Sequence, residues 1–94
     1  MKEGFIIFYV TCANGSVPIC GANVSIAVNG KEESALTDKS GKTPPFAFCF
    51  FDDRPHLEGY AEISSENFEK TFLRDIKLYR GVTVVRIVNL DRKK

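Results

Sequence analysis

The chain has 94 residues, of which 44% are hydrophobic, with eight Phe, three Tyr and no Trp. This length suits one domain, and the apolar fraction is high enough for a dense core. The formal net charge of +1 excludes a strong electrostatic attraction to nucleic acid or to acidic membranes, and no apolar run approaches the roughly 20 residues that span a membrane.

The first expected strand covers residues 5–12. It is apolar on both sides, and one face is more uniformly so: Ile6, Phe8, Val10 and Cys12. We expect a strand that is central in its sheet or covered on both faces. Lys2 before an apolar run is also a feature of secretion signals, but Glu3 and the shortness of the run favour a strand.

The cleanest signal in the chain is the alternation over 22–28, in which Ala22, Val24, Ile26 and Val28 are separated by Asn23, Ser25 and Ala27. It predicts a half-buried strand. Asn29-Gly30 predicts a hairpin turn, because both residues tolerate a positive φ. The chain then returns as a short strand over 33–37. Asp38 begins the next turn, in which its carboxylate is expected to accept a hydrogen bond from the backbone N–H two residues on.

In the middle of the chain, two prolines at 44–45 suggest an edge or an extended connection. The segment 46–51 is nearly all apolar and is either a core strand or an exposed sticky segment. The carboxylate pair Asp52-Asp53 that follows is expected to be solvated rather than to bind a cation.

Alternation returns over 57–65, and these residues are expected to point inward: Leu57, Gly59, Ala61 and Ile63. The strand over 72–79 has Phe72, Ile76 and Leu78 as core candidates. The final strand, 82–90, is rich in β-branched residues, but its facing is ambiguous because apolar residues fall on both sides.

Strand signals separated by turns, with no sustained helical periodicity, predict an all-β fold. We expect a single domain over residues 1–94, an antiparallel Greek-key β-sandwich of about seven strands.

Two stretches, 18–26 with Gly21-Ala22 at its corner and 36–41, resemble those of carboxypeptidase regulatory-like domains, which have the transthyretin-like (prealbumin-like) sandwich. Residues 61–68 and 75–83 resemble a bacterial subset that accompanies cell-wall and spore-cortex hydrolases as non-catalytic parts. The resemblance covers nearly the whole chain and is specific for fold rather than for function. Asn67 stands where the subset has Gly, and we expect the bend to survive because Asn tolerates a positive φ.

The resemblance implies a non-catalytic structural or protein-interaction module, an accessory domain linked to the bacterial envelope or spore, without a cofactor. We expect it to be cytoplasmic or spore-associated rather than secreted. The expected partner is a protein bound through a sheet edge or an aromatic patch, and the same edges allow a homo-oligomer. The candidate interaction residues are Tyr60, Tyr79 and Phe51.

Two other functions stay open. The first is a carbohydrate-binding module that recognises peptidoglycan through surface aromatics. The second is the transthyretin-like 5-hydroxyisourate hydrolase, whose family ends in Tyr-Arg-Gly-Ser. This chain has Tyr79-Arg80-Gly81-Val82, followed by a further strand, and its only imidazole is His56. Because general acid–base chemistry near neutral pH most often needs a positioned imidazole or a tuned carboxylate, we do not expect an enzyme.

The three cysteines, Cys12, Cys20 and Cys49, are odd in number and lack Cys-x-x-Cys spacing, so we expect small buried hydrophobes rather than disulfides or metal ligands. A covalent alternative is a Lys–Asn isopeptide bond between Lys2, which precedes the apolar run of the first expected strand, and Asn89 in the last expected strand.

Overall fold

Eight strands and no helix make up the part of the chain that the computed structural model describes, residues 2–51 and 53–93. The strands are β1 (Lys2–Cys12), β2 (Val17–Pro18), β3 (Asn23–Val28), β4 (Lys31–Leu36), β5 (Phe46–Phe50), β6 (Leu57–Ser64), β7 (Thr71–Leu78) and β8 (Thr83–Asn89). They form two sheets of four strands, which confirms the prediction of an all-β sandwich.

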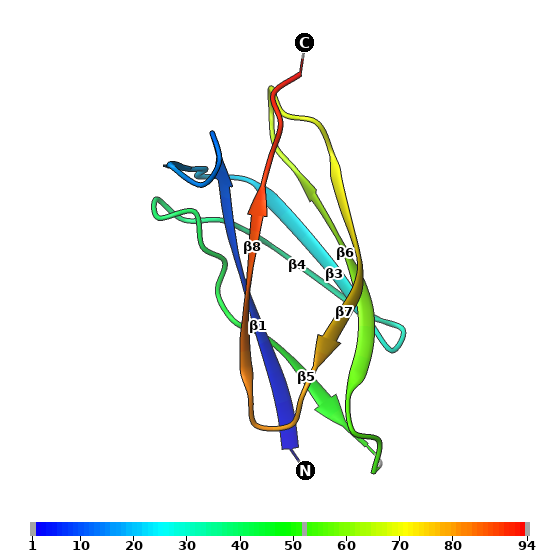
Figure 1. Ribbon diagram of the computed structural model, residues 1–94. Coiled ribbons are helices and arrows are strands. Elements are labelled where there is room, and N and C mark those ends of the chain that lie inside the picture. The colour runs from blue at the N-terminus through cyan, green and yellow to red at the C-terminus, as the bar shows by residue number, and fades with distance from the viewer. Residues whose placement is uncertain (1, 52, 94) are drawn as a thin grey trace.

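Strand β1 is the centre of the first sheet (β1, β2, β5 and β8), as expected. Along one edge it pairs antiparallel with β5 over its first half and with β2 near its end. Along the other edge it pairs with β8, and this pair is parallel, which the expectation of an antiparallel sandwich did not include. Figure 1 shows β1 and β8 side by side along the length of an elongated molecule, 45 × 20 × 19 Å.

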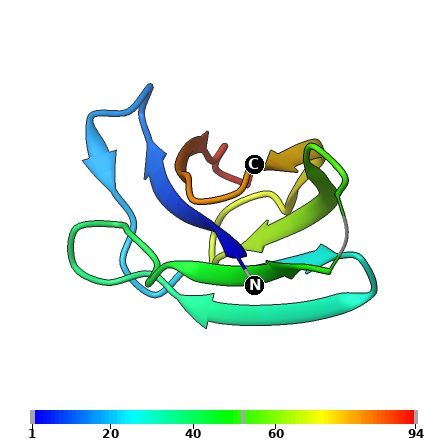
Figure 2. The ribbon, with the colours of Figure 1, turned by 90° about the horizontal axis from the view of Figure 1, so that it is seen from below.

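The second sheet is antiparallel throughout, in the order β4-β3-β6-β7. Seen from below, the strands of both sheets surround one interior (Figure 2). The buried apolar side chains form one hydrophobic cluster in that interior. The cluster contains alternate residues of β1, β3 and β5. Strand β5 contributes three of the eight Phe of the chain: Phe46, Phe48 and Phe50. The apolar segment 46–51 is therefore a core strand in which Ala47 and Cys49 are half-buried, and Phe51 is exposed directly after it.

The predicted facing of β6 is confirmed at its apolar positions, since Leu57, Ala61 and Ile63 are buried. The prediction for β7 is wrong at Phe72, which is 62% exposed, although Ile76 and Leu78 are buried. The cause is a change of register, in which Gly59 pairs with Ile76 but Ala61 pairs with Leu73. The extra residue forms a bulge in β7. Before the bulge, the odd-numbered residues of β7 point inward instead of the even-numbered ones.

Three local predictions about turns are confirmed. Asn29 and Gly30 join β3 to β4 with φ values of 55° and 82°, the left-handed pair that a tight hairpin needs. Asn67 keeps the bend before β7 with a φ of 71°. Asp38 Oδ1 accepts a hydrogen bond from the N–H of Ser40 at 2.9 Å.

The fold excludes the isopeptide alternative, because its two residues lie at opposite ends of the first sheet. Lys2 pairs with Phe50 at the start of β1, whereas Asn89 pairs with Thr11 at its end. The side-chain oxygen of Asn89 instead accepts a hydrogen bond from the Gly15 N–H at 3.3 Å.

The second sheet depends on Gly59 in β6. A Cβ at this position would overlap the carbonyl oxygen of Ala27 and lie 2.6 Å from Cγ2 of Val28 on the neighbouring strand. Only a residue without a side chain lets β3 and β6 approach this closely.

We therefore expect Gly59→Ala to lower the free energy of unfolding by about 3 kcal/mol, since the added methyl overpacks a sheet that cannot move apart locally. Gly21→Ala is the matched control: its φ is 77°, but nothing lies within 4 Å of the added Cβ, so only the backbone cost of about 1 kcal/mol applies. Urea unfolding of both variants measures the difference. Equal losses would contradict the role of close strand contact.

Candidate functional site

Strand β8 forms an open edge of the first sheet. Two hydrogen bonds set the phase of its ladder with β1: Phe5 N–H donates to Val82 O at 3.0 Å, and Leu90 N–H donates to Thr11 O at 2.7 Å. In an evenly spaced parallel ladder, alternate residues of β8 must then direct both their N–H and their C=O group to β1. These are Val84, Arg86 and Val88. The others turn their N–H and C=O groups to the opposite side: Thr83, Val85, Ile87 and Asn89. Within the described residues, β8 pairs with no strand on that side.

The sequence of β8 makes this edge long and flat. Five of its seven residues are β-branched, and its only charged residue is the half-buried Arg86. The strand contains no Pro, and its register with β1 runs without a shift from Thr83 to Asn89. Edge strands usually carry prolines, inward charges or bulges that prevent pairing with another chain, and β8 carries none of these outside Arg86.

The other edges of the two sheets are protected in the usual ways. Strand β4 begins with three consecutive charged residues, Lys31, Glu32 and Glu33. Strand β7 is bulged beside Arg74 and Asp75, and Asp75 has a φ of 59°. On the far side of the first sheet, β2 has two residues including a proline, and β5 is a five-residue strand that follows Pro44-Pro45.

The outer face of the first sheet is apolar next to this open edge. Val85 is 57% exposed and Ile87 is 66% exposed. They lie beside Ile7 and Tyr9 of β1, which are half-buried and point to the same side. A strand that paired with β8 would therefore meet apolar side chains as well as unpaired backbone groups.

Sequence reasoning anticipated a sheet edge for partner binding but did not locate it in β8. The signal was present in the ambiguous facing of residues 82–90. Apolar residues on both sides of a strand are typical of a strand covered on both faces. In β8 only the inward side is covered, because Val88 and Leu90 are buried while Val85 and Ile87 are not.

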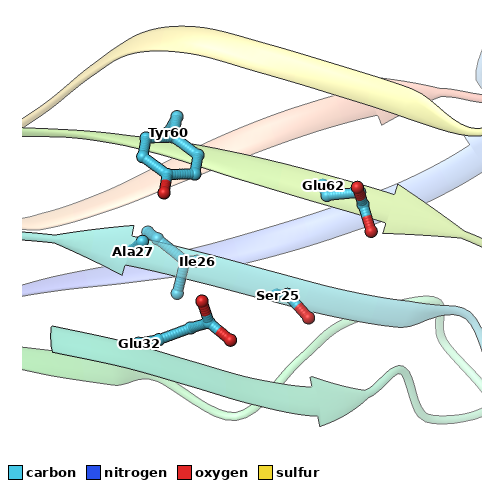
Figure 3. A pocket seen from close by; sticks show the side chains of 6 residues that line it. All are labelled: Ser25, Ile26, Ala27, Glu32, Tyr60 and Glu62. Carbon is cyan, nitrogen blue, oxygen red and sulfur yellow. The ribbon is translucent and has the colours of Figure 1, made fainter. Parts of the chain in front are cut away.

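Of the three predicted interaction residues, Tyr60 has the most defined surroundings. It projects from β6 on the outer face of the second sheet and is 62% exposed. It lies at a shallow hollow of about 150 Å³. Figure 3 shows its ring among the other side chains that line this hollow. The lining also includes Ile26, Ala27 and polar residues from three strands: Ser25, Glu32 and Glu62. Glu62 is already paired with Lys70, with Oε2 and Nζ 3.8 Å apart.

Phe51 and Tyr79 lie elsewhere. Phe51 is 80% exposed directly after β5 and lines a second hollow of about 140 Å³, together with Lys31, Phe48 and other residues. Tyr79 follows β7, and its ring packs against His56 with ring centroids 6.1 Å apart. No ring contact joins any two of the three predicted residues in the described part of the chain.

His56 and Arg80, the residues that suggested a hydrolase, contact different partners. His56 Nε2 lies 3.0 Å from Glu58 Oε1, and the guanidinium of Arg80 lies over the Phe50 ring at 4.9 Å. Arg80-Gly81 forms the turn into β8, in which Gly81 has a φ of 69°.

Among residues 2–51 and 53–93, no three His, Cys, Asp or Glu side chains gather closely enough to hold a metal ion. Asp52 of the predicted carboxylate pair lies outside the described residues. The three cysteines are free. The expectation that all three are buried is wrong, since Cys12 is buried, Cys49 is half-buried and Cys20 is exposed in the turn before β3.

No protein-family model matches this chain, and no curated protein matches it either. The described residues also contain no helix that is long and apolar enough to cross a membrane.

The pair His56–Glu58 predicts a pH effect. The hydrogen bond from His56, together with the attraction of its positive charge, lowers the pKa of Glu58 below its ordinary value of 4.5. Because the folded-state pKa is depressed, the stabilisation by this pair is present above the ordinary carboxyl pKa and is lost as the pH falls through the folded-state value.

We expect His56→Asn to raise the pKa of Glu58 toward 4.5, as measured by a carbon NMR titration of its carboxyl group. Lys77→Gln is the control and should raise this pKa less, because the attraction of Lys77 is the smallest of the lowering effects. A larger shift from the Lys77 variant than from the His56 variant would contradict the assignment.

Proposed function

We propose that this chain is a non-catalytic protein-interaction module that receives an extended strand of its partner at the open edge of β8. The observation that supports this proposal is the edge itself: seven flat residues with outward N–H and C=O groups at Thr83, Val85, Ile87 and Asn89. Unpaired backbone groups in a β-branched edge strand favour the addition of another strand.

The chemistry of strand addition suits what β8 offers. Backbone hydrogen bonds supply affinity that does not depend on the sequence of the partner. Specificity then comes from alternate side chains, and Val85 and Ile87 would meet every second side chain of the added strand on the outer face. We therefore expect a partner segment in which apolar residues alternate.

The resemblance to carboxypeptidase regulatory-like domains supports an accessory role for this module. Such domains of the bacterial subset stand beside cell-wall and spore-cortex hydrolases as non-catalytic parts. On this proposal, the domain is an accessory part at the envelope or spore that makes its contact through β8 and takes no part in the chemistry. The two-sheet fold agrees with the resemblance, and the partner rests on the open edge alone.

Val85→Pro tests the proposal, because it removes an N–H that faces away from β1 and leaves the ladder between β1 and β8 intact. The probes are nonapeptides selected for binding to the wild-type chain from a displayed random library. We expect alternating apolar peptides that slow hydrogen exchange at the Val85 and Ile87 amides, and we expect Val85→Pro to weaken their binding at least tenfold.

Val85→Thr is the matched control, since it keeps the N–H and the β-branch, and it should retain most of the binding. Unchanged hydrogen-exchange protection of the β1 amides verifies that each variant is folded. Peptides that bind equally well to the Pro variant would overturn the proposal of strand addition at β8.

A glycan site at Tyr60 is the second candidate. An exposed aromatic ring beside carboxylates and a hydroxyl is an arrangement that can stack on a sugar and hydrogen-bond its hydroxyl groups. Glu32 and Ser25 would supply such acceptors at the hollow shown in Figure 3.

Sedimentation of the chain with purified peptidoglycan tests this candidate. If a sugar stacks on Tyr60, Tyr60→Ala should abolish the co-sedimentation and Tyr60→Phe, which keeps the ring, should retain it. No recovery of the wild-type chain with the glycan would discard this function.

A further inference from the structure

We propose that the strand received at the edge of β8 is β8 of a second copy of this chain, antiparallel to the first across a two-fold axis at Val85. This inference deepens the proposed function and rests on it, because it names the partner at the same edge. The dimer would join two first sheets into one continuous sheet.

The edges of the chain favour β8 as its own partner. Pairing of β8 with β4 of another copy would bring the charges of Lys31 and Glu32 against an apolar strand. Pairing with β7 would meet the bulge at Asp75, and pairing with β2 would meet Pro18. Strand β5 has only five residues, and a pairing extended beyond its start would meet Pro44-Pro45. Only a second β8 is equally long, flat and apolar. Because the pairing of two identical edges is isologous, it closes as a dimer and does not propagate into a fibre.

The net charge of the chain is compatible with self-association. Two copies that each carry a formal charge of +1 repel each other only weakly. Arg86 is the one charged residue in β8, and its side chain belongs to the half-buried inward set rather than to the outer face.

The phase of the ladder limits where the two-fold axis can lie. Residues with outward backbone groups must face each other across the axis, which restricts a well-overlapped pairing to an axis at position 85, 86 or 87. An axis at Arg86 would place the two Arg86 residues directly opposite each other, and like charges in that position are destabilising.

An axis at Val85 is the better of the remaining two. It opposes Val85 to its own copy and Thr83 to Ile87, so that every hydrogen-bonded pair consists of β-branched residues. An axis at Ile87 would oppose Val85 to Asn89, whose side-chain oxygen already accepts the hydrogen bond from Gly15. In both arrangements Arg86 faces a valine rather than another arginine.

A charge-swap experiment on the full chain tests the axis. Val85 is 57% exposed, so Val85→Lys and Val85→Glu should both fold. With the axis at Val85, each variant alone places two like charges opposite each other. We expect the wild type to dimerise in sedimentation equilibrium between about 1 µM and 1 mM, whereas each variant alone should have a dissociation constant at least tenfold higher. An equimolar mixture should then recover the dimer as a heterodimer.

The same swap at Ile87 is the matched control. With the axis at Val85, the two copies of residue 87 are separated by four residue positions, about 13 Å along the strands. This distance exceeds the Debye length at physiological salt, so a mixture of Ile87→Lys and Ile87→Glu should recover the dimer much less than the Val85 mixture does.

The outcomes separate this inference from the proposed function. A wild-type chain that stays monomeric at 1 mM while its selected nonapeptides still depend on Val85 would overturn the dimer alone. A wild-type dimer that Val85→Lys does not weaken would place the interface elsewhere and also overturn it. Stronger recovery by the Ile87 mixture than by the Val85 mixture would overturn the axis at Val85. If neither dimerisation nor peptide binding responds to Val85, both proposals fail.

Discussion

Strand β1 determines the rest of the architecture because both of its backbone edges and its inward face are in use. Its even-numbered residues direct their backbone groups to the side of β5 and β2; the Val10 N–H, for example, donates to Gly41 O at 2.7 Å. Its odd-numbered residues direct theirs to β8. The inward side chains Ile6, Phe8 and Val10 are completely buried. Every other strand of the first sheet is therefore placed by its contact with β1.

This central position explains why β8 ends up at an edge. The last strand enters the first sheet from the Tyr79–Val82 turn and runs parallel to β1. The chain after β8 then leaves the sheet, since Lys93 N–H donates to Asn67 O and Glu69 N–H donates to Asp91 O. The segment after β8 packs against the bend that precedes β7, so within the described residues nothing from this chain covers the outer side of β8. The open edge is thus a result of topology as well as of sequence.

Strict alternation made β3 and β6 predictable, because each polar residue in them marks the solvent side. The failures have physical causes that a local pattern does not carry. Phe72 was assigned to the core because a bulge beside Asp75 is invisible to a period of two. Neither the parallel pairing of β8 with β1 nor the separation of Phe51 from Tyr60 could be predicted, since both depend on contacts between distant segments. When a strand has apolar residues on both sides, as β8 does, its sequence does not show which side is buried until its neighbours are known.

The pairing of β1 with β8 also orders events in time. The Thr11 hydroxyl donates to Val88 O across 77 positions of sequence, so β1 is synthesised well before the strand that pairs with it. In the second sheet, β3 pairs with β4 and β6 pairs with β7, which are neighbours in sequence, and the hairpin at Asn29-Gly30 can close early. Translation at about 5–20 residues per second leaves β1 without β8 for several seconds. During that time the inward side chains of Ile6, Phe8 and Val10 lack their neighbours from β8. Closing a loop of 77 positions also makes this step slow. The first sheet is therefore completed only after β8 has been synthesised, and the nascent chain is most exposed to aggregation in the interval before that.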